Sequence, residues 1–273
     1  MDAHVDARVD ARPDHRIAYN MIRWHIQSVL DHPWLAAGRP PQGLLTVAET
    51  ARYASYISPQ RRRDWLLGRW TAKQLIQLHV AATCGFSPAL ASFSIEQEPS
   101  GVPFAASLDP TLYGSGKHGR LPVSLSISHS RGYAFCALSD DPMAHVRVGA
   151  DIEVVEPQPA DFGDKFFTPA EQANIQAAPV NNRVLLTIAT WSVKEAVLKA
   201  STLGMRATPQ SVECKIRTGR PRHWTPLTVT LQPTTRQASG AVGPLRAWWR
   251  VIDNRLLPGT SLVLTLAAFG ATL

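Results

Sequence analysis

Apolar and polar residues alternate in short runs over most of the chain, and this period-two pattern is typical of β-strands. The expected strands cover residues 22–30, 124–128, 133–138, 148–155, 227–231, 247–252 and 262–269. Residues 99–119 are rich in glycine, proline and serine, and we expect them to form a loop.

Helices are predicted between these strands by apolar positions at helical spacing. Two long helices are expected over residues 60–83 and 185–201. Each is preceded by a shorter helix that opens with a capping box, a threonine followed three residues later by a glutamate. The two boxes begin at Thr46 and Thr168.

The two halves of the chain repeat one another. Thr46 and Thr168 are 122 residues apart, and Trp70 and Trp191, each on a long predicted helix, are 121 residues apart. Two matches at nearly the same separation predict an internal duplication. We therefore expect an α+β fold of two similar α+β lobes, related by a pseudo-twofold axis, with a cleft between them.

The predicted lobes differ in their chemistry. We expect a flexible leader at residues 1–16, an N-terminal lobe at 17–143 and a C-terminal lobe at 144–273. Gln74 on the long helix of the first lobe stands where Glu195 stands in the second. Since only the second lobe carries the acid, the site should be asymmetric.

Composition narrows the class of protein. Hydrophobic residues make up 45% and charged residues 18% of the 273 positions, which is typical of a folded globular chain. No apolar stretch approaches the ~18 residues of a transmembrane helix, so we expect no membrane partner. The polar leader lacks the apolar segment of a signal peptide, and the three cysteines have no metal-ligand spacing. These features favour the cytoplasm.

The net charge of +7 favours an anionic partner, which can be a nucleic acid, a phosphorylated cofactor or an acidic protein. Arg61 or Arg62 can share a helix face with Arg69. The default interpretation is that these arginines form a solvated helix face. The more specific interpretation is that they bind a phosphate, because the planar guanidinium suits phosphate. No aromatic residues interleave with the basic ones in the manner of a nucleic-acid motif, so nucleic acid is not an expected partner.

Two carboxylates lie close together on a predicted strand. Asp151 and Glu153 are two residues apart and therefore point to the same face. Such oxygen ligands suit Mg²⁺, which commonly bridges protein carboxylates and substrate phosphates. The alternative is an exposed strand face paired with arginines.

A second charged motif lies on the second long helix. Trp191, Glu195 and Lys199 follow one another at intervals of four residues and share one face. An ordinary exposed ion pair explains Glu195 and Lys199, but Trp191 on the same stripe should be buried, which places the pair at the edge of a cleft. Lys194 lies about 100° around the helix and fits a solvated surface as well.

The third motif is the run Ser126–Ser130, in which His129 follows a strand among hydroxyl groups. This histidine can donate to a phosphate, although a turn histidine bonded to the backbone is the simpler interpretation. Ser128 and His129 are adjacent in a strand and point to opposite faces, which argues against a serine hydrolase.

Taken in order, these segments resemble the 4′-phosphopantetheinyl transferase superfamily, in its two-lobed, surfactin-activating branch. The matching segments are Gly101–Phe104 (family Gly-Lys-Pro), Ser126–Ser130 (Ser-hydrophobic-Ser-His-Ser), Val148–Glu153 (Gly-hydrophobic-Asp-hydrophobic-Glu) and Trp191–Lys199 (Trp-Ser/Thr-x-Lys-Glu-x-x-x-Lys). With the added support of Leu67–Arg69 and Phe166–Glu171, the resemblance extends by motif from about residue 45 to residue 204, and onward by the pattern of strands.

The resemblance implies an enzyme that transfers the phosphopantetheine arm of coenzyme A to a serine of an apo carrier protein and releases 3′,5′-ADP. The implied Mg²⁺ ligands are Asp151, Glu153 and Glu195. Glu195 would also help to deprotonate the serine, and Lys199 would neutralise and protonate the leaving phosphate. Two lobes in one chain imply a monomer.

The resemblance also implies a set of coenzyme A contacts: Arg61, Arg62, Arg69, Ser128, His129, Lys194 and Lys199. Of these, Arg69 and His129, with Arg61 or Arg62, would hold the 3′-phosphate, and Lys194 would border the pyrophosphate.

One departure from the family pattern concerns the first motif. Val102 replaces the usual lysine between Gly101 and Pro103, which removes a phosphate contact. Phosphate binding is therefore expected to depend more on Arg69 and His129. The alternative function is a non-catalytic two-lobed module that binds acidic proteins through its basic surface. Three carboxylates and Lys199 would have no purpose in such a module.

Overall fold

A computed structural model describes residues 22–108, 119–140 and 146–270. The expected leader and the expected lobe boundary at 143/144 lie outside the described residues. The N-terminal half contains β1 (Ile22–Ser28), α1 (Pro33–Ala36), α2 (Val47–Ser55), α3 (Pro59–Cys84), β2 (Phe93–Gln97), β3 (Pro103–Ser107), β4 (Ser124–Ser130) and β5 (Tyr133–Ser139).

The C-terminal half contains β6 (Arg147–Val154), α4 (Phe162–Phe166), α5 (Pro169–Ala177), α6 (Val180–Ala200), β7 (Val212–Lys215), β8 (Thr225–Leu231), α7 (Pro233–Ser239), β9 (Leu245–Asp253) and β10 (Ser261–Phe269). Short 3₁₀ turns cover Leu90–Ser92, Gly204–Arg206 and Pro209–Ser211. In the described part of the chain no helix has both the length and the apolar character needed to cross a bilayer.

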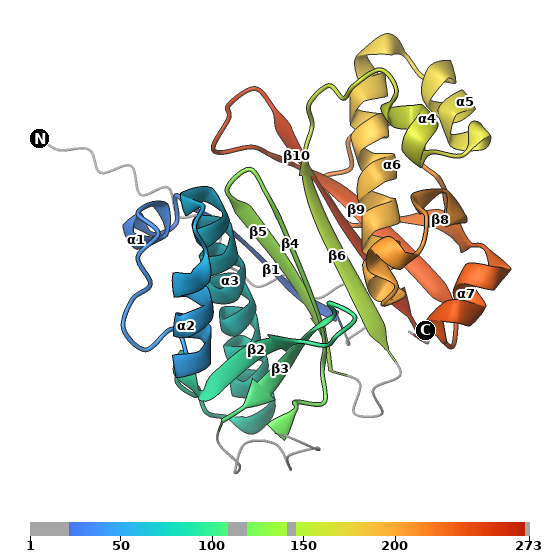
Figure 1. Cartoon of the computed structure of the whole chain (residues 1–273). Coiled ribbons are helices and arrows are strands. Elements are labelled where there is room, and N and C mark those ends of the chain that lie inside the picture. The colour runs from blue at the N-terminus through green and yellow to red at the C-terminus, as the bar shows by residue number, and fades with distance from the viewer. Residues whose placement is uncertain (1–21, 109–118, 141–145, 271–273) are drawn as a thin grey trace, which may run out of the picture.

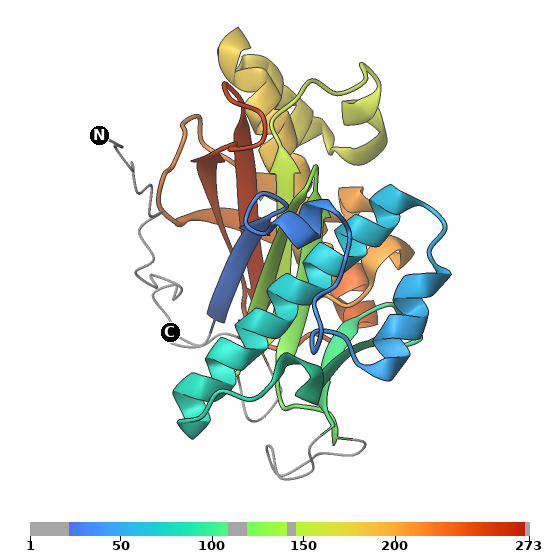
Figure 2. The ribbon, with the colours of Figure 1, turned by 90° about the vertical axis from the view of Figure 1, so that its left-hand side faces the viewer.

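The helices and the antiparallel sheets confirm the predicted α+β class, and the two halves resemble each other in the order of their elements. The strand order is β1-β5-β4 in the first half and β6-β10-β9-β8-β7 in the second, with all neighbours antiparallel. The β2-β3 ribbon corresponds to β7-β8, and α3 corresponds to α6. The long helices lie on opposite outer sides with the sheets between them (Figure 1). Figure 2 shows α3 running along the face of its sheet, where it contacts β5 and β1.

All seven expected strands and all four expected helices are present within a few residues of their predicted ends. The loop expected over residues 99–119 is wrong in part, because β3 forms there and pairs with β2. Strand β3 begins at a proline and contains two alanines, so its apolar signal is weak. Strands β2 and β7 and helix α7 were not anticipated either, since each is short.

Both capping boxes form as predicted. Thr46 accepts a hydrogen bond from the Glu49 backbone N–H, and Glu49 accepts one from Thr46 in return. Thr168 and Glu171 repeat this arrangement at the start of α5. These caps satisfy backbone donors that a helix start otherwise leaves without partners.

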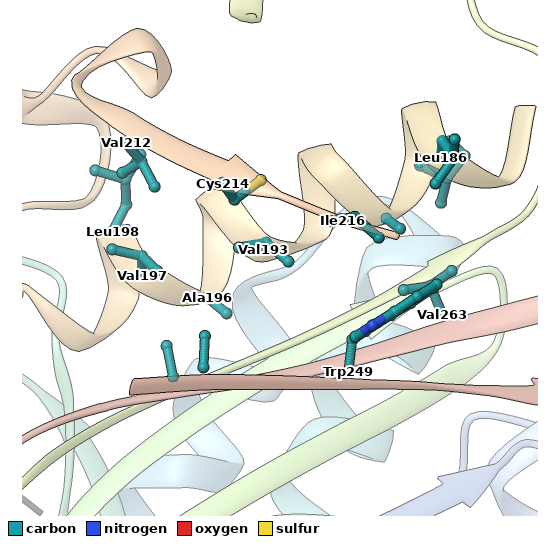
Figure 3. Close-up of a cluster of buried hydrophobic side chains, with 14 of the residues drawn as sticks. Leu186, Val193, Ala196, Val197, Leu198, Val212, Cys214, Ile216, Trp249 and Val263 are labelled. Carbon is teal, nitrogen blue, oxygen red and sulfur yellow. The ribbon is translucent and has the colours of Figure 1, made fainter. Parts of the chain in front are cut away.

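The core of the C-terminal half lies between α6 and the strands that it covers. Buried apolar side chains from α6 meet those of β7 and of the central strands β9 and β10 (Figure 3). Leu186, Val193 and Val197 are among the helix residues, and Cys214 and Trp249 lie opposite. Removal of this apolar surface from water holds the helix against the sheet.

Helix α6 approaches β6 so closely that position 149 has no room for a side chain. A Cβ atom on Gly149 would lie 1.9 Å from the Ala196 carbonyl oxygen and 2.6 Å from the Ala200 backbone nitrogen. Both atoms belong to the backbone of a buried helix and cannot rotate away. The glycine of the Val148–Glu153 motif is therefore a packing requirement.

We expect Gly149→Ala to lower the free energy of unfolding by about 3 kcal/mol, because the helix would have to move away from the sheet. Chemical denaturation measures this change. Gly163→Ala is the matched control, since its Cβ would meet only ordinary contacts, the nearest at 3.7 Å. Equal stability of the two variants would contradict the close approach.

Candidate functional site

A cavity of about 600 Å³ lies between the two halves. Its wall is formed by the N-terminal part of α3, the β2–β3 turn, β4, the start of β6 and the C-terminal end of α6. Because both halves contribute residues, this cavity is the cleft that the repeated sequence predicts.

Several of the predicted cationic residues line the cavity. Arg61, Arg69, His129 and Lys199 all contribute to its wall. Among the described residues of the wall, Asp64 is the only acidic one, and Gln60 donates hydrogen bonds to it at 2.9 Å. The cavity is therefore suited to an anion.

Arg69 is held firmly in the wall. Its guanidinium lies over the Trp65 ring at 4.7 Å from the centroid, and its Nε is 3.9 Å from the Glu49 carboxylate. The residue is 9% exposed, and burial lowers the pKa of Arg69. A cation fixed by packing in this way loses little freedom when it binds a phosphate.

The structure separates the clustered arginines. Arg61 faces the cavity, whereas Arg62 donates to the Tyr56 carbonyl oxygen at 2.7 Å and lies over the Tyr53 ring. Arg63 donates to Gln60 at 2.9 Å. Arg61 is therefore part of the cavity wall, and Arg62 is not.

Lys199 connects the cavity with the predicted carboxylates. It lines the wall, and its Nζ lies 2.6 Å from Oδ1 of Asp151. Ser128 donates to the same oxygen at 2.8 Å. Within the described structure, the buried Oδ2 of Asp151 has no hydrogen-bond partner.

The other two carboxyl groups lie close to Asp151. Glu153 accepts hydrogen bonds from Ser130 and from the Trp191 indole, and burial, with the charge of Asp151, raises the pKa of Glu153 to about 7. Burial also raises the pKa of Glu195. The positive charge of Lys199 lowers this pKa, and the negative charge of Asp151 raises it further. Trp191 is half-buried beside this group, not fully buried as expected.

These carboxyl groups fit a divalent cation. Among the described residues, no three acidic, histidine or cysteine side chains are already gathered as a metal site. However, Asp151 Oδ2 is an acceptor that lacks a donor, and crowded carboxylates with raised pKa values are stabilised by a nearby cation. Oxygen donors of this kind are the ligands that Mg²⁺ prefers.

Besides Arg62, two more of the predicted coenzyme A contacts lie outside the cavity wall. Lys194 is fully buried, with its Nζ 2.7 Å from Glu171 Oε2 and hydrogen bonds to the carbonyl oxygens of Pro209 and Val212. The prediction that Lys194 borders the pyrophosphate is therefore wrong. Ser128 is also buried and bonded to Asp151 and Lys199, so it supports the carboxylates and does not line the wall.

The burial of Lys194 has an exact parallel in the other half. Lys73 on α3 is fully buried, with its Nζ 2.5 Å from the Glu49 carboxylate. The other oxygen of Glu49 accepts the backbone N–H of Ile95 on β2, as Glu171 accepts that of Cys214 on β7. In each half, one buried ion pair ties a capping box, a long helix and a strand together.

The asymmetry that was predicted from Gln74 is visible in the contacts. Gln74 on α3 accepts a hydrogen bond at 2.7 Å from Gln27 on β1, the strand that corresponds to β6. Neutral amides thus meet in the N-terminal half, whereas acids meet in the C-terminal half.

Arg147 is a cavity residue that the sequence analysis missed. It lies at the first position of β6, four residues before Asp151, and therefore on the same face of the strand. Its Nη1 donates to the Ser239 carbonyl oxygen at 2.7 Å. The spacing from Asp151 was the only signal that could have identified it.

Comparison with known proteins gives consistent matches. Residues 147–241 match the model of the 4′-phosphopantetheinyl transferase superfamily. The chain is 27% identical over 143 residues to a 4′-phosphopantetheinyl transferase of Bacillus subtilis, which covers 52% of this chain and 55% of the relative. It is 31% identical over 98 residues to the 4′-phosphopantetheinyl transferase gsp of Aneurinibacillus migulanus, covering 34% and 39%.

The matched segments thus span about half the length of these relatives or less. Among solved structures, holo-[acyl-carrier-protein] synthase of Thermotoga maritima is 17% identical, with a TM-score of 0.33, and the match covers 46% of this chain and 64% of that one.

The Glu171–Lys194 pair provides a test of the buried framework. We expect Lys194→Met to lower the free energy of unfolding by about 4 kcal/mol, because it leaves the Glu171 carboxylate buried without its cation. Lys73→Met should have a similar effect through Glu49. Lys215→Met, on the exposed side of β7, is the control. If Lys194→Met unfolds at the same denaturant concentration as the parent chain, Lys194 is not a framework residue.

Proposed function

Because the chain belongs to the 4′-phosphopantetheinyl transferase superfamily, we propose that it transfers the 4′-phosphopantetheine moiety of coenzyme A to a serine of an apo carrier protein and releases 3′,5′-ADP. One observation carries this proposal. Lys199 lines a cationic cavity, and its Nζ lies 2.6 Å from the carboxylate of Asp151. The charge of Lys199 also acts on Glu153 and Glu195, so a region suited to phosphate and a region suited to accept a proton are adjacent at this residue.

The cationic wall supports the binding of coenzyme A. Arg61, Arg69 and His129 come from the N-terminal half and would hold the 3′-phosphate of the nucleotide. Lys199, which the C-terminal half contributes to the wall, would face the pyrophosphate. Arginine is well suited to the first task, since its guanidinium can donate two parallel hydrogen bonds to one phosphate.

Asp151, Glu153 and Glu195 would hold Mg²⁺ at the edge of this cavity. When bound, the ion would neutralise negative charge on the pyrophosphate. The buried and unpartnered Oδ2 of Asp151 supports this assignment.

Glu195 and Lys199 support the two proton transfers. A serine Oγ of the carrier would form a bond to the phosphorus that bears the pantetheine arm, while the bond from this phosphorus to the oxygen of 3′,5′-ADP breaks. Glu195 would accept the serine proton, and the raised pKa of its carboxyl group favours that role. Lys199 would donate to the oxygen of the leaving phosphate.

The partner is proposed to be an acidic carrier protein or carrier domain, because the chain carries a net charge of +7. We further propose that one chain acts as a monomer in the cytoplasm, in the manner of the two-lobed, surfactin-activating type.

Intact mass spectrometry of apo carrier proteins tests this function. Incubation with the protein, coenzyme A and Mg²⁺ should add the mass of one phosphopantetheine, and EDTA should prevent the addition. Glu195→Gln should slow the transfer by about 100-fold or more, since it removes the base. Glu213→Gln, an exposed glutamate on β7, is the control. No mass gain on any carrier, or full activity of Glu195→Gln, would contradict the mechanism.

Arg147 offers a replacement for the phosphate contact that is missing at Val102. Both residues line the cavity, but Val102 is apolar and the family lysine is absent there. The Arg147 guanidinium donates through Nη1 to the Ser239 carbonyl oxygen, and the side chain is half-buried in the wall. We therefore assign Arg147 to a phosphate of coenzyme A.

We expect Arg147→Ala to weaken coenzyme A binding about tenfold by calorimetry, as befits a lost hydrogen bond to a charged group. Val102→Lys in the same variant should recover part of the affinity, because it returns a cation to the same cavity. Arg183→Ala is the control, since Arg183 also donates to backbone carbonyl oxygens but lies outside this cavity. An unchanged affinity of Arg147→Ala would remove this residue from the site.

A further inference from the structure

Strand β4 carries a serine at every second position, and all four serines face β6. Ser124 Oγ accepts the Val148 backbone N–H at 3.1 Å, and Ser126 Oγ accepts that of Ala150 at 2.9 Å. Strands β4 and β6 belong to different sheets, so these hydroxyl groups take the place of ladder hydrogen bonds between the two halves.

The last two serines of β4 have different partners. Ser128 donates to Asp151 Oδ1 at 2.8 Å, and Ser130 donates to Glu153 Oε2 at 3.0 Å. The same strand that binds the backbone of β6 at one end therefore binds two acidic side chains at the other.

We propose that Ser130, together with Ser128, is a positioning residue that sets the conformations of the Glu153 and Asp151 carboxylates for a divalent cation. This inference rests on the proposed function, which needs those carboxylates as ligands. It assigns to the N-terminal half a direct role in forming a site whose acids all belong to the C-terminal half.

The contacts of Glu153 show why the hydroxyl matters. A free glutamate side chain rotates about three bonds, and its ordering costs conformational entropy. Here Ser130 holds Oε2 from β4, and the Trp191 indole holds Oε1 at 3.2 Å from α6. Both oxygens are thus oriented, one by each half of the molecule, before a cation binds.

Asp151 is oriented in a complementary way. Ser128 and Lys199 both donate to Oδ1, at 2.8 and 2.6 Å. Oδ2 has no partner among the described residues, so it would be available to a cation without competing with either donor. Donors to ligand carboxylates generally fix ligand geometry and raise metal affinity.

Binding of Mn²⁺, followed by electron paramagnetic resonance in the presence of saturating coenzyme A, tests the inference without relying on activity. We expect Ser130→Ala to weaken Mn²⁺ binding about tenfold. Ser130→Thr, which keeps the hydroxyl, should bind Mn²⁺ as the parent chain does. Ser94→Ala is the matched control, because Ser94 on β2 donates to the Glu96 carboxylate at 2.8 Å, away from the cavity wall.

The outcomes separate this inference from the proposed function. If the parent chain binds Mn²⁺ and Ser130→Ala binds it equally well, the positioning role is wrong and the proposed function is unaffected. Equal losses in Ser130→Ala and Ser94→Ala would indicate a general loss of structure and would also overturn the role. If the parent chain binds no Mn²⁺, the metal site itself fails, and the inference fails with it.

Discussion

The close contact between α6 and β6 at Gly149 is the constraint on which the site depends. The helix backbone occupies the space that a side chain at this position would need. Because the two elements touch there, residues a short distance along each of them meet as well. Lys199, which lies between Ala196 and Ala200 on the helix, reaches Asp151, two residues beyond Gly149 on the strand. If the helix lay farther from the sheet, the Asp151 carboxylate and the Lys199 ammonium group would be too far apart to form their ion pair.

The two halves of the molecule have similar frameworks, and the acidic group belongs to the C-terminal half. In each half a buried lysine, Lys73 or Lys194, neutralises the glutamate of a capping box, and that glutamate also binds the following strand. Such pairs are costly to break, because a single buried charge would remain. The long helix and the first strand carry different side chains in the two halves. In the N-terminal half, the neutral amides of Gln27 and Gln74 form a hydrogen bond, whereas the corresponding elements of the C-terminal half carry acidic side chains. The two halves therefore resemble each other in their buried ion pairs and differ in the acidic group.

Cationic side chains line the cavity, and the acidic side chains lie next to it, behind Lys199. The cations of its wall come from both halves, and the acidic group lies beyond Lys199. A fixed arrangement of this kind stabilises charge without the reorganisation that water would require. For the proposed reaction it implies a direction, in which the nucleotide end of coenzyme A would lie against the arginines of α3 and the reacting pyrophosphate near the acids of β6.

The sequence by itself determined the α+β class, the capping boxes, the long helices and the identity of the acidic motif, because these depend on local spacing. It also predicted the contact of Lys199 with the cleft. Tertiary structure decided the rest. Lys194 has the same local pattern as a surface lysine, and only the position of Glu171 in space shows that it is buried. Arg147 lines the cavity because of how β6 packs against its neighbours, and the same packing brings Ser130 into contact with Glu153. Local spacing fixes which face a side chain occupies, but the element that packs on that face is set by contacts between residues far apart in the chain.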